Sequence, residues 1–81
     1  MASNHDLQLY IRYTCPYCVR VLRYMERAGI KVPLHDITAS EDDRLFLVRE
    51  GGKQQVPCLF IDGVAMYESL DIIDWMEREL A

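Results

Sequence analysis

The stretch that decides the fold comprises residues 7–29, with the sequence LQLYIRYTCPYCVRVLRYMERAG. From Leu7 to Tyr13 the side chains alternate between apolar and polar, which is the period of a β-strand. From Pro16 to Ala28 the apolar residues recur mostly at steps of three and four, which predicts a helix. Two cysteines therefore lie where a strand gives way to a helix.

The pair Cys15 and Cys18 is spaced for dithiol redox chemistry. Pro16 suits the first position of a helix, so Cys15 falls at the N-cap, where its sulfur faces unpaired backbone N–H groups. These donors and the positive end of the helix dipole favour the thiolate, so we expect a lowered pKa and assign Cys15 as the nucleophile. Cys18 lies one turn further along the same helix face, close enough to form a disulfide but deeper, which predicts the resolving thiol.

The rest of the chain carries further strand and helix signals. The expected elements are a strand over 30–37, a helix after Ser40 that ends at Gly51-Gly52, strands over 56–61 and 64–67, and a final helix over about 69–80. Asp62-Gly63 predicts a hairpin turn between the last two strands. In the middle helix we expect Leu45, Phe46 and Val48 to form the buried stripe.

This order, β-α-β-α-β-β-α, is thioredoxin-like. A strand, a helix and a second strand at this spacing form a right-handed crossover, so the first two strands should be parallel. The hairpin adds an antiparallel edge, which gives an α/β fold with a four-stranded mixed sheet and three helices on its two faces. The first helix begins at the carboxyl end of the first strand, where open α/β sheets place their reactive groups.

Length and composition bound the class of protein. The 81 residues are expected to form a single domain, 1–81, near the lower size limit for a fold without staples. No apolar run is long enough to span a bilayer, and the polar start, Met1 to Asp6, lacks the pattern of a secretory signal. One C-x-x-C among three cysteines fits a reducing compartment, so we expect a cytoplasmic monomer that binds no membrane.

The net charge of −4 argues against nucleic-acid binding, which depends on clustered cations. The charge is unevenly placed, because Arg12, Arg20, Arg23, Arg27 and Lys31 surround the cysteine pair while the last helix is acidic. A basic rim near a reactive sulfur stabilises a thiolate and attracts an anionic thiol substrate. For Arg23 and Arg27 we favour the simpler interpretation of a solvated helix face.

Four segments together resemble those of a glutaredoxin: residues 14–18, Val56-Pro57, Asp62-Gly63 and Glu68-Ser69. The resemblance covers nearly the whole chain, and a Cys-Pro-Tyr-Cys box with Val-Pro at this distance is highly specific. It implies a thiol-disulfide oxidoreductase that reduces protein disulfides and glutathione mixed disulfides, with glutathione as reducing co-substrate and no metal required. In the implied reaction Cys15 attacks the mixed disulfide and becomes glutathionylated, and a second glutathione or Cys18 releases it.

The resemblance also implies a glutathione site on two segments far from the cysteines in sequence. Pro57 matches the cis-proline of the family, which would turn the Val56 backbone toward the sulfurs and let it pair with the cysteinyl part of glutathione. Glu68 and Ser69 begin the last helix, where free N–H groups and the hydroxyl can hold the γ-glutamyl carboxylate. Simple helix capping is compatible with that role.

Three further residues are candidates for the same site. Arg12 stands where glutaredoxins usually carry a lysine, and it would hold the glycine carboxylate or stabilise the thiolate. Gln55 stands where threonine is commoner, and its amide either reaches the tripeptide or belongs to an ordinary exposed strand residue. Tyr17, between the cysteines, would form one wall of the groove.

Two features depart from the common pattern. Residues 63–69 look more like the glutathione-transferase amino-terminal domain, which uses a Glu-Ser pair in the same role, than like the usual glutaredoxin segment. Cys58, directly after Pro57, has no part in the common mechanism, and we favour a small buried hydrophobe over a regulatory thiol.

Other classes of function carry less support. A zinc site would need a second pair of ligands beyond Cys15 and Cys18. A glutathione-ligated iron–sulfur carrier is a capacity of some relatives, although Pro16-Tyr17 is typical of the redox-active type. A thioredoxin-like dithiol reductant fed by a flavoprotein reductase would lack the glutathione preference that Arg12 indicates. A noncatalytic glutathione-binding module is the remaining alternative.

Overall fold

The computed structural model describes residues 5–81, so the first four residues of the expected domain and of its polar start lie outside the described part. Seven elements follow in the expected order. Their bounds are β1 Leu7–Ile11, α1 Pro16–Ala28, β2 Leu34–Asp36, α2 Glu41–Gly51, β3 Cys58–Ile61, β4 Val64–Tyr67 and α3 Ser69–Glu79. Among residues 5–81 no helix has both the length and the apolar character needed to cross a bilayer.

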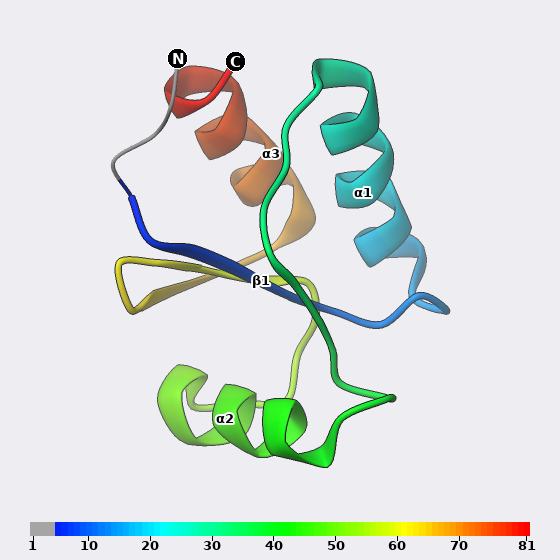
Figure 1. Cartoon of the computed structure of the whole chain (residues 1–81), viewed down its shortest axis with the longest axis vertical. Coiled ribbons are helices and arrows are strands. Elements are labelled where there is room, and N and C mark those ends of the chain that lie inside the picture. Colours follow the sequence, from blue (N-terminus) through cyan, green and yellow to red (C-terminus); the bar gives the residue numbers. More distant parts are fainter. Residues whose placement is uncertain (1–4) are drawn as a thin grey trace.

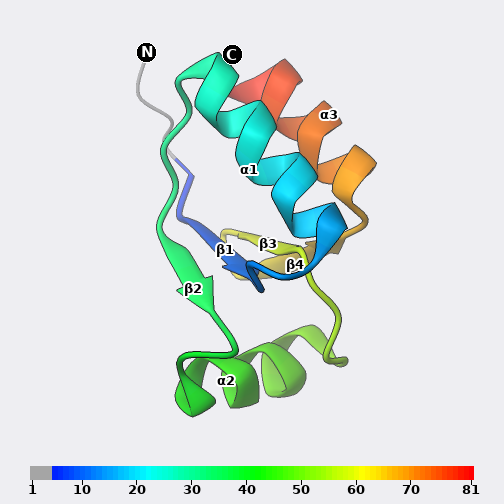
Figure 2. The ribbon, with the colours of Figure 1, turned by 90° about the vertical axis from the view of Figure 1, so that its right-hand side faces the viewer.

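The sheet has the strand order β2-β1-β3-β4. Strand β1 runs parallel to β2 and antiparallel to β3, and β3 runs antiparallel to β4. Helices α1 and α3 lie side by side over one face of the sheet, and α2 lies alone over the other (Figure 1, Figure 2). The prediction of a four-stranded mixed sheet with helices on both faces is confirmed.

The hairpin between β3 and β4 has the backbone that its sequence predicts. Asp62 and Gly63 both have positive φ, 51° and 85°. The type I′ turn, one of the two favoured two-residue hairpin turns, has this sign at both positions, and its twist matches that of the strands.

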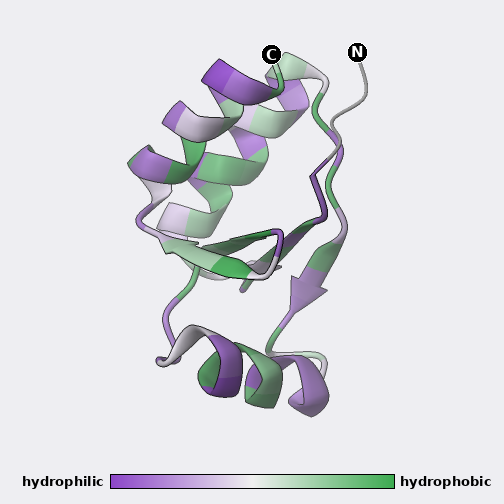
Figure 3. Cartoon of the chain, turned by 90° about the vertical axis from the view of Figure 1, so that its left-hand side faces the viewer, coloured by the Kyte–Doolittle hydropathy of each residue, from purple (hydrophilic) through white to green (hydrophobic). Residues whose placement is uncertain are grey.

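Each face of the sheet carries its own hydrophobic cluster. The larger cluster fills the space under α1 and α3 and includes Cys18 and Leu59. The smaller cluster, under α2, consists of Tyr10, Ile37, Leu47, Cys58 and Phe60. Because side chains alternate along a strand, β3 supplies Leu59 to one cluster and its two neighbours to the other. Polar residues gather on the outer faces of the helices (Figure 3).

The strands are shorter than their sequence patterns indicate. Strand β1 stops at Ile11 because the chain turns at once, with the Cys15 N–H donating to the Arg12 carbonyl at 3.0 Å. Strand β2 covers only 34–36 of the expected 30–37, and β3 begins at Cys58. In both cases a proline stands just before the strand, and proline has no N–H to give to a β-ladder.

The expectation for the middle helix was wrong about which side chains are buried. Leu47 is the fully buried residue of α2, whereas Leu45 and Val48 are 49% and 38% exposed. Among residues 5–81, no other helix lies on the same side of the sheet as α2 (Figure 2). Helix α2 therefore buries only a narrow line of contact, with Phe46 packed partly against the same cluster.

Gly51 marks a close approach at the end of α2. A Cβ at this position would overlap the Tyr67 hydroxyl, which itself donates to the Lys53 carbonyl at 3.1 Å. Glycine therefore lets β4 and the end of α2 come together. The hydrogen bond from Tyr67 to Lys53 then holds the loop that leads to Pro57.

Candidate active site

Cys15 is the N-cap of α1, as predicted. Its backbone is extended (φ −89°, ψ 122°), Pro16 is the first helical residue, and the Val19 N–H donates to the Cys15 carbonyl at 3.0 Å. The side chain is half-buried, so a substrate disulfide can reach the sulfur. The local sequence places this thiol at the mouth of a helix without help from any distant contact.

Several groups act on the Cys15 thiol. Burial, the largest single effect, raises its pKa, but the backbone N–H groups of Cys18 and Tyr17, the Cys18 thiol and the Arg12 charge act the other way. Together they lower the pKa of Cys15 below its ordinary value. The expected thiolate nucleophile is thus supported by the surrounding donors.

Cys18 has the opposite character. It is fully buried, and its sulfur accepts the Arg12 backbone N–H at 3.4 Å. Burial raises the pKa of Cys18 to about 12, with the nearby Cys15 sulfur adding to the increase. Cys15 and Cys18 form no disulfide in this structure, and Cys18 is protonated at neutral pH.

The Val56-Pro57 peptide bond is cis, as the resemblance implied. The segment lies against the cysteines although 41 positions separate Val56 from Cys15, and the Cys15 sulfur is 4.0 Å from the Val56 carbonyl oxygen. Val56 is half-buried and Pro57 is buried. The backbone of Val56 thus lies within reach of a group attached to the sulfur.

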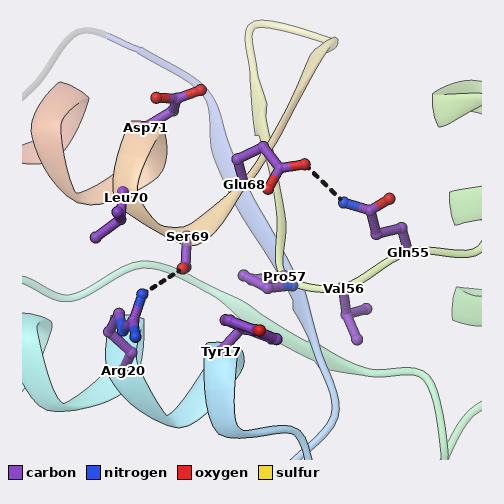
Figure 4. Close-up of a pocket in the computed structure, with 9 residues that line it drawn as sticks. All are labelled: Tyr17, Arg20, Gln55, Val56, Pro57, Glu68, Ser69, Leu70 and Asp71. Atoms are coloured by element: carbon purple, nitrogen blue, oxygen red, sulfur yellow. Dashed lines mark hydrogen bonds between the residues drawn. The ribbon is translucent and has the colours of Figure 1, made fainter.

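A cleft of about 570 Å³ opens beside this segment (Figure 4). Its lining contains six of the predicted binding residues, namely Tyr17, Gln55, Val56, Pro57, Glu68 and Ser69. Three elements that are distant in sequence thus converge: the first turn of α1, the loop before β3 and the start of α3. The lining also includes Arg20, Leu70 and Asp71, which sequence reasoning did not assign to the site.

The start of α3 is held by its neighbours in the cleft. Glu68 is the N-cap with φ 73°, a conformation that costs a non-glycine residue about 1–3 kcal/mol, and such strain clusters at functional sites. Its carboxylate accepts from Gln55 Nε2 at 3.3 Å, whereas the buried Ser69 hydroxyl accepts from Arg20 Nη1 at 3.5 Å. The Glu68 side chain therefore makes no cap bond to α3.

Arg20 was expected only as one of the basic residues around the cysteines, and the structure adds that it lines the cleft. It projects from α1 across the cleft toward α3, and its guanidinium carbon lies 5.6 Å from the centre of the Tyr17 ring (Figure 4). Its place among the basic residues around the cysteines, three positions after Tyr17 on the same helix face, was the available signal. Arg12, in contrast, does not line the cleft, and its charge acts on the Cys15 thiol.

Cys58 lies in the cluster under α2, on the opposite face of the sheet from Cys18. It is fully buried, and burial raises the pKa of its thiol to about 11. The interpretation as a small buried hydrophobe is confirmed, and its side chain points away from Cys15. No three His, Cys, Asp or Glu side chains within residues 5–81 are grouped so that they could hold a metal ion.

Comparison with known proteins agrees with this geometry. The glutaredoxin family model matches residues 7–66. A probable glutaredoxin from Synechocystis sp. is 32% identical over 63 residues, covering 76% of this chain and 72% of that protein. Glutaredoxin 3 of Escherichia coli is 28% identical over 57 residues, covering 70% of this chain and 69% of that protein.

Solved structures show the same fold. Glutaredoxin 2 of Salmonella typhimurium in complex with glutathione aligns with a TM-score of 0.73 and 30% identity, over 88% of this chain and 32% of that one. Glutathione transferase Omega 3C of Trametes versicolor aligns with a TM-score of 0.78 and 30% identity, over 90% of this chain and 33% of that one. The chain therefore belongs to the glutaredoxin family and is a thiol-disulfide oxidoreductase with a thioredoxin-like fold.

Proposed function

We propose that this protein uses glutathione to reduce glutathione mixed disulfides and protein disulfides. The observation that carries the proposal is the position of the Cys15 sulfur, which has a lowered pKa and lies 4.0 Å from the Val56 carbonyl at the cleft. A nucleophilic sulfur beside a backbone edge suits a substrate that is both a disulfide and a peptide.

In the first step the Cys15 thiolate attacks the glutathione sulfur of a mixed disulfide. A new disulfide forms between Cys15 and glutathione, the original S–S bond breaks, and the protein cysteine leaves as a thiolate that takes a proton from water. The attack is an in-line exchange at sulfur. It is fastest when the pKa of the attacking thiol lies near the ambient pH.

In the second step another glutathione thiolate attacks the glutathione sulfur bound to Cys15. This releases glutathione disulfide and restores the Cys15 thiolate. Cys18 can instead attack the Cys15 sulfur and release glutathione, leaving an internal disulfide. The burial of Cys18 favours the first route, because desolvation is the largest of the effects that keep this thiol protonated.

The cleft would supply partners for two parts of the tripeptide. The Val56 backbone would pair with the cysteinyl residue, and the N–H groups at the start of α3, with the Ser69 hydroxyl, would hold the γ-glutamyl carboxylate. Tyr17 forms a wall, Gln55 can reach the ligand with its amide, and Arg20 adds positive charge beside Ser69. We extend the proposal to a monomer that works without a metal in a reducing compartment such as the cytoplasm, where a glutathione pool is present.

The decisive experiment compares three cysteine variants in glutathione-dependent reduction of a glutathionylated peptide. Cys15→Ser should lower the rate by at least about a thousandfold, because the nucleophile is lost. Cys18→Ser should retain most of the activity on the mixed disulfide and lose activity on protein disulfides. Cys58→Ala is the matched control and should react like the wild type. An unchanged rate in Cys15→Ser would refute the assignment.

A further inference from the structure

A second hollow, of about 520 Å³, lies along the outer side of α1, and we refer to it as the arginine groove. It is lined by Thr14, Pro16, Val19, Arg20, Arg23 and Arg27. The three arginines follow one another at steps of three and four, so they share one face of the helix. The groove is thus an open basic hollow that follows α1 and includes Thr14 and Pro16, the chain neighbours of Cys15.

The arginines of the groove differ from those elsewhere on the surface. Arg44, Arg49 and Arg78 each form an ion pair with an acidic side chain. Within residues 5–81 neither Arg23 nor Arg27 forms a salt bridge or a side-chain hydrogen bond. Arg23 and Arg27 are both exposed, so the solvated helix face expected from the sequence is confirmed, and their charges are accessible to an anionic partner.

The groove and the glutathione cleft adjoin each other near the nucleophile. Arg20 lines both of them. The Cys15 sulfur lies 4.0 Å from the carbonyl oxygen of Val56, which lines the cleft. The two chain neighbours of Cys15, Thr14 and Pro16, line the groove. A glutathione mixed disulfide has two arms that diverge from its S–S bond. If the tripeptide occupies the cleft, the groove is the adjoining hollow that can receive the protein arm.

We propose that the arginine groove binds an acidic segment of the glutathionylated protein, next to the cysteine that is being reduced. The inference rests on the proposed function. The distribution of charge supports an anionic occupant. The chain as a whole carries −4, so most of its surface repels anions, whereas the three arginines of the groove attract them. A short acidic peptide fits better than a long polyanion, since the net charge opposes any partner that extends beyond the groove.

The spacing of the arginines predicts where the acidic residues stand. Along the helix, Arg20, Arg23 and Arg27 lie about 6, 10 and 16 Å beyond Pro16 at 1.5 Å per residue. An extended peptide advances about 3.3 Å per residue, so its acidic side chains would stand about two to five residues from the reactive cysteine. A protein without acidic residues at that distance would gain nothing from the groove.

The test uses two glutathionylated peptides of equal length. One carries Asp or Glu two to five residues from its cysteine on both sides, and the other carries Asn or Gln there. Arg27→Glu is compared with Arg49→Glu, which makes the same charge change on the other side of the sheet. Arg27 and Arg49 are matched because each is the basic residue in the last turn of its helix. The low-molecular-weight mixed disulfide of glutathione and 2-mercaptoethanol reports basal activity.

The wild type and Arg49→Glu should reduce the acidic peptide with a kcat/KM about tenfold above that of the neutral peptide, and the gain should shrink in high salt. Arg27→Glu should lose most of this gain and keep its basal activity. Equal effects of the two variants, or no preference in the wild type, would overturn the groove while turnover of the peptides upheld the proposed function. Failure to turn over either peptide or the small disulfide would overturn the proposed function and the groove with it.

An oligonucleotide decides between the two classes of anionic occupant. If it inhibits reduction of the acidic peptide more strongly than an unmodified acidic peptide of equal charge, the groove belongs to a nucleic-acid partner and the proposal is wrong. Weaker inhibition by the oligonucleotide supports the acidic peptide.

Discussion

Cys15 and Cys58, which belong to opposite faces of the sheet, have opposite character. On the face covered by α1 and α3, Cys15 sits at a helix start with a lowered pKa and partial exposure. On the face covered by α2, Cys58 sits inside a strand, fully buried, with its pKa raised to about 11. The same side chain becomes a nucleophile or a core residue, and the difference lies in whether burial of the sulfur outweighs the hydrogen bonds and charges that lower its pKa.

The largest expected difference between the faces is in thiol reactivity. A thiol with a pKa of about 11 is thiolate in only about one molecule in ten thousand at pH 7. Cys15 should therefore react with iodoacetamide at least about a hundredfold faster than Cys58 in the folded protein. Mass spectrometry of the labelled peptides measures both rates in one sample, and labelling in denaturant is the control. Similar alkylation rates in the folded protein would show that Cys15 and Cys58 do not differ in reactivity.

The packing of α2 can be tested at the close approach between Gly51 and Tyr67. Gly51→Ala should lower the free energy of unfolding by about 1–3 kcal/mol, because its new Cβ meets the Tyr67 hydroxyl and forces the neighbours apart. Denaturant unfolding measures the loss, and adding Tyr67→Phe to Gly51→Ala should recover part of it. Full stability in Gly51→Ala would show that the approach is not tight.

The buried thiols should make stability fall at high pH. The pKa of Cys58 is raised in the folded state, so its proton stabilises the fold up to the ordinary thiol pKa near 9, and stability is lost as the pH rises from there toward about 11. Between pH 8 and pH 10 the wild type should lose about 1 kcal/mol more than Cys58→Ala. Parallel losses in the two proteins would mean that Cys58 does not contribute.

The smallest expected effect concerns Arg12, which acts on one face only. Its charge lowers the pKa of Cys15, so Arg12→Gln should raise that pKa and slow alkylation of Cys15 at pH 6 by about twofold to fivefold. The reactivity of Cys58 should not change. Arg49→Gln is the control for a general loss of positive charge. If Arg12→Gln also weakens glutathione binding, Arg12 reaches the tripeptide as the resemblance implied.

How much of the site could be predicted depended on how local its causes are. The position and role of Cys15 could be predicted from its neighbours Pro16 and Cys18, because a helix start is signalled by residues a few positions apart. Six cleft residues were identified through the resemblance to glutaredoxins. Arg20 was not, because its role depends on how α1 packs against α3. The buried line of α2 was misjudged for a similar reason, since only the sheet beneath it selects Leu47.

The amino-acid sequence by itself determined the order of the elements, the hairpin turn at Asp62-Gly63, the nucleophile and the family. These features rest on interactions between residues a few positions apart, such as helix capping and strand alternation. The tertiary structure decided which face Cys58 points to, that Arg20 joins the cleft, and that unpaired arginines line a groove beside the nucleophile. Those features require segments tens of residues apart to meet, and only the packing of the helices on the sheet brings them together.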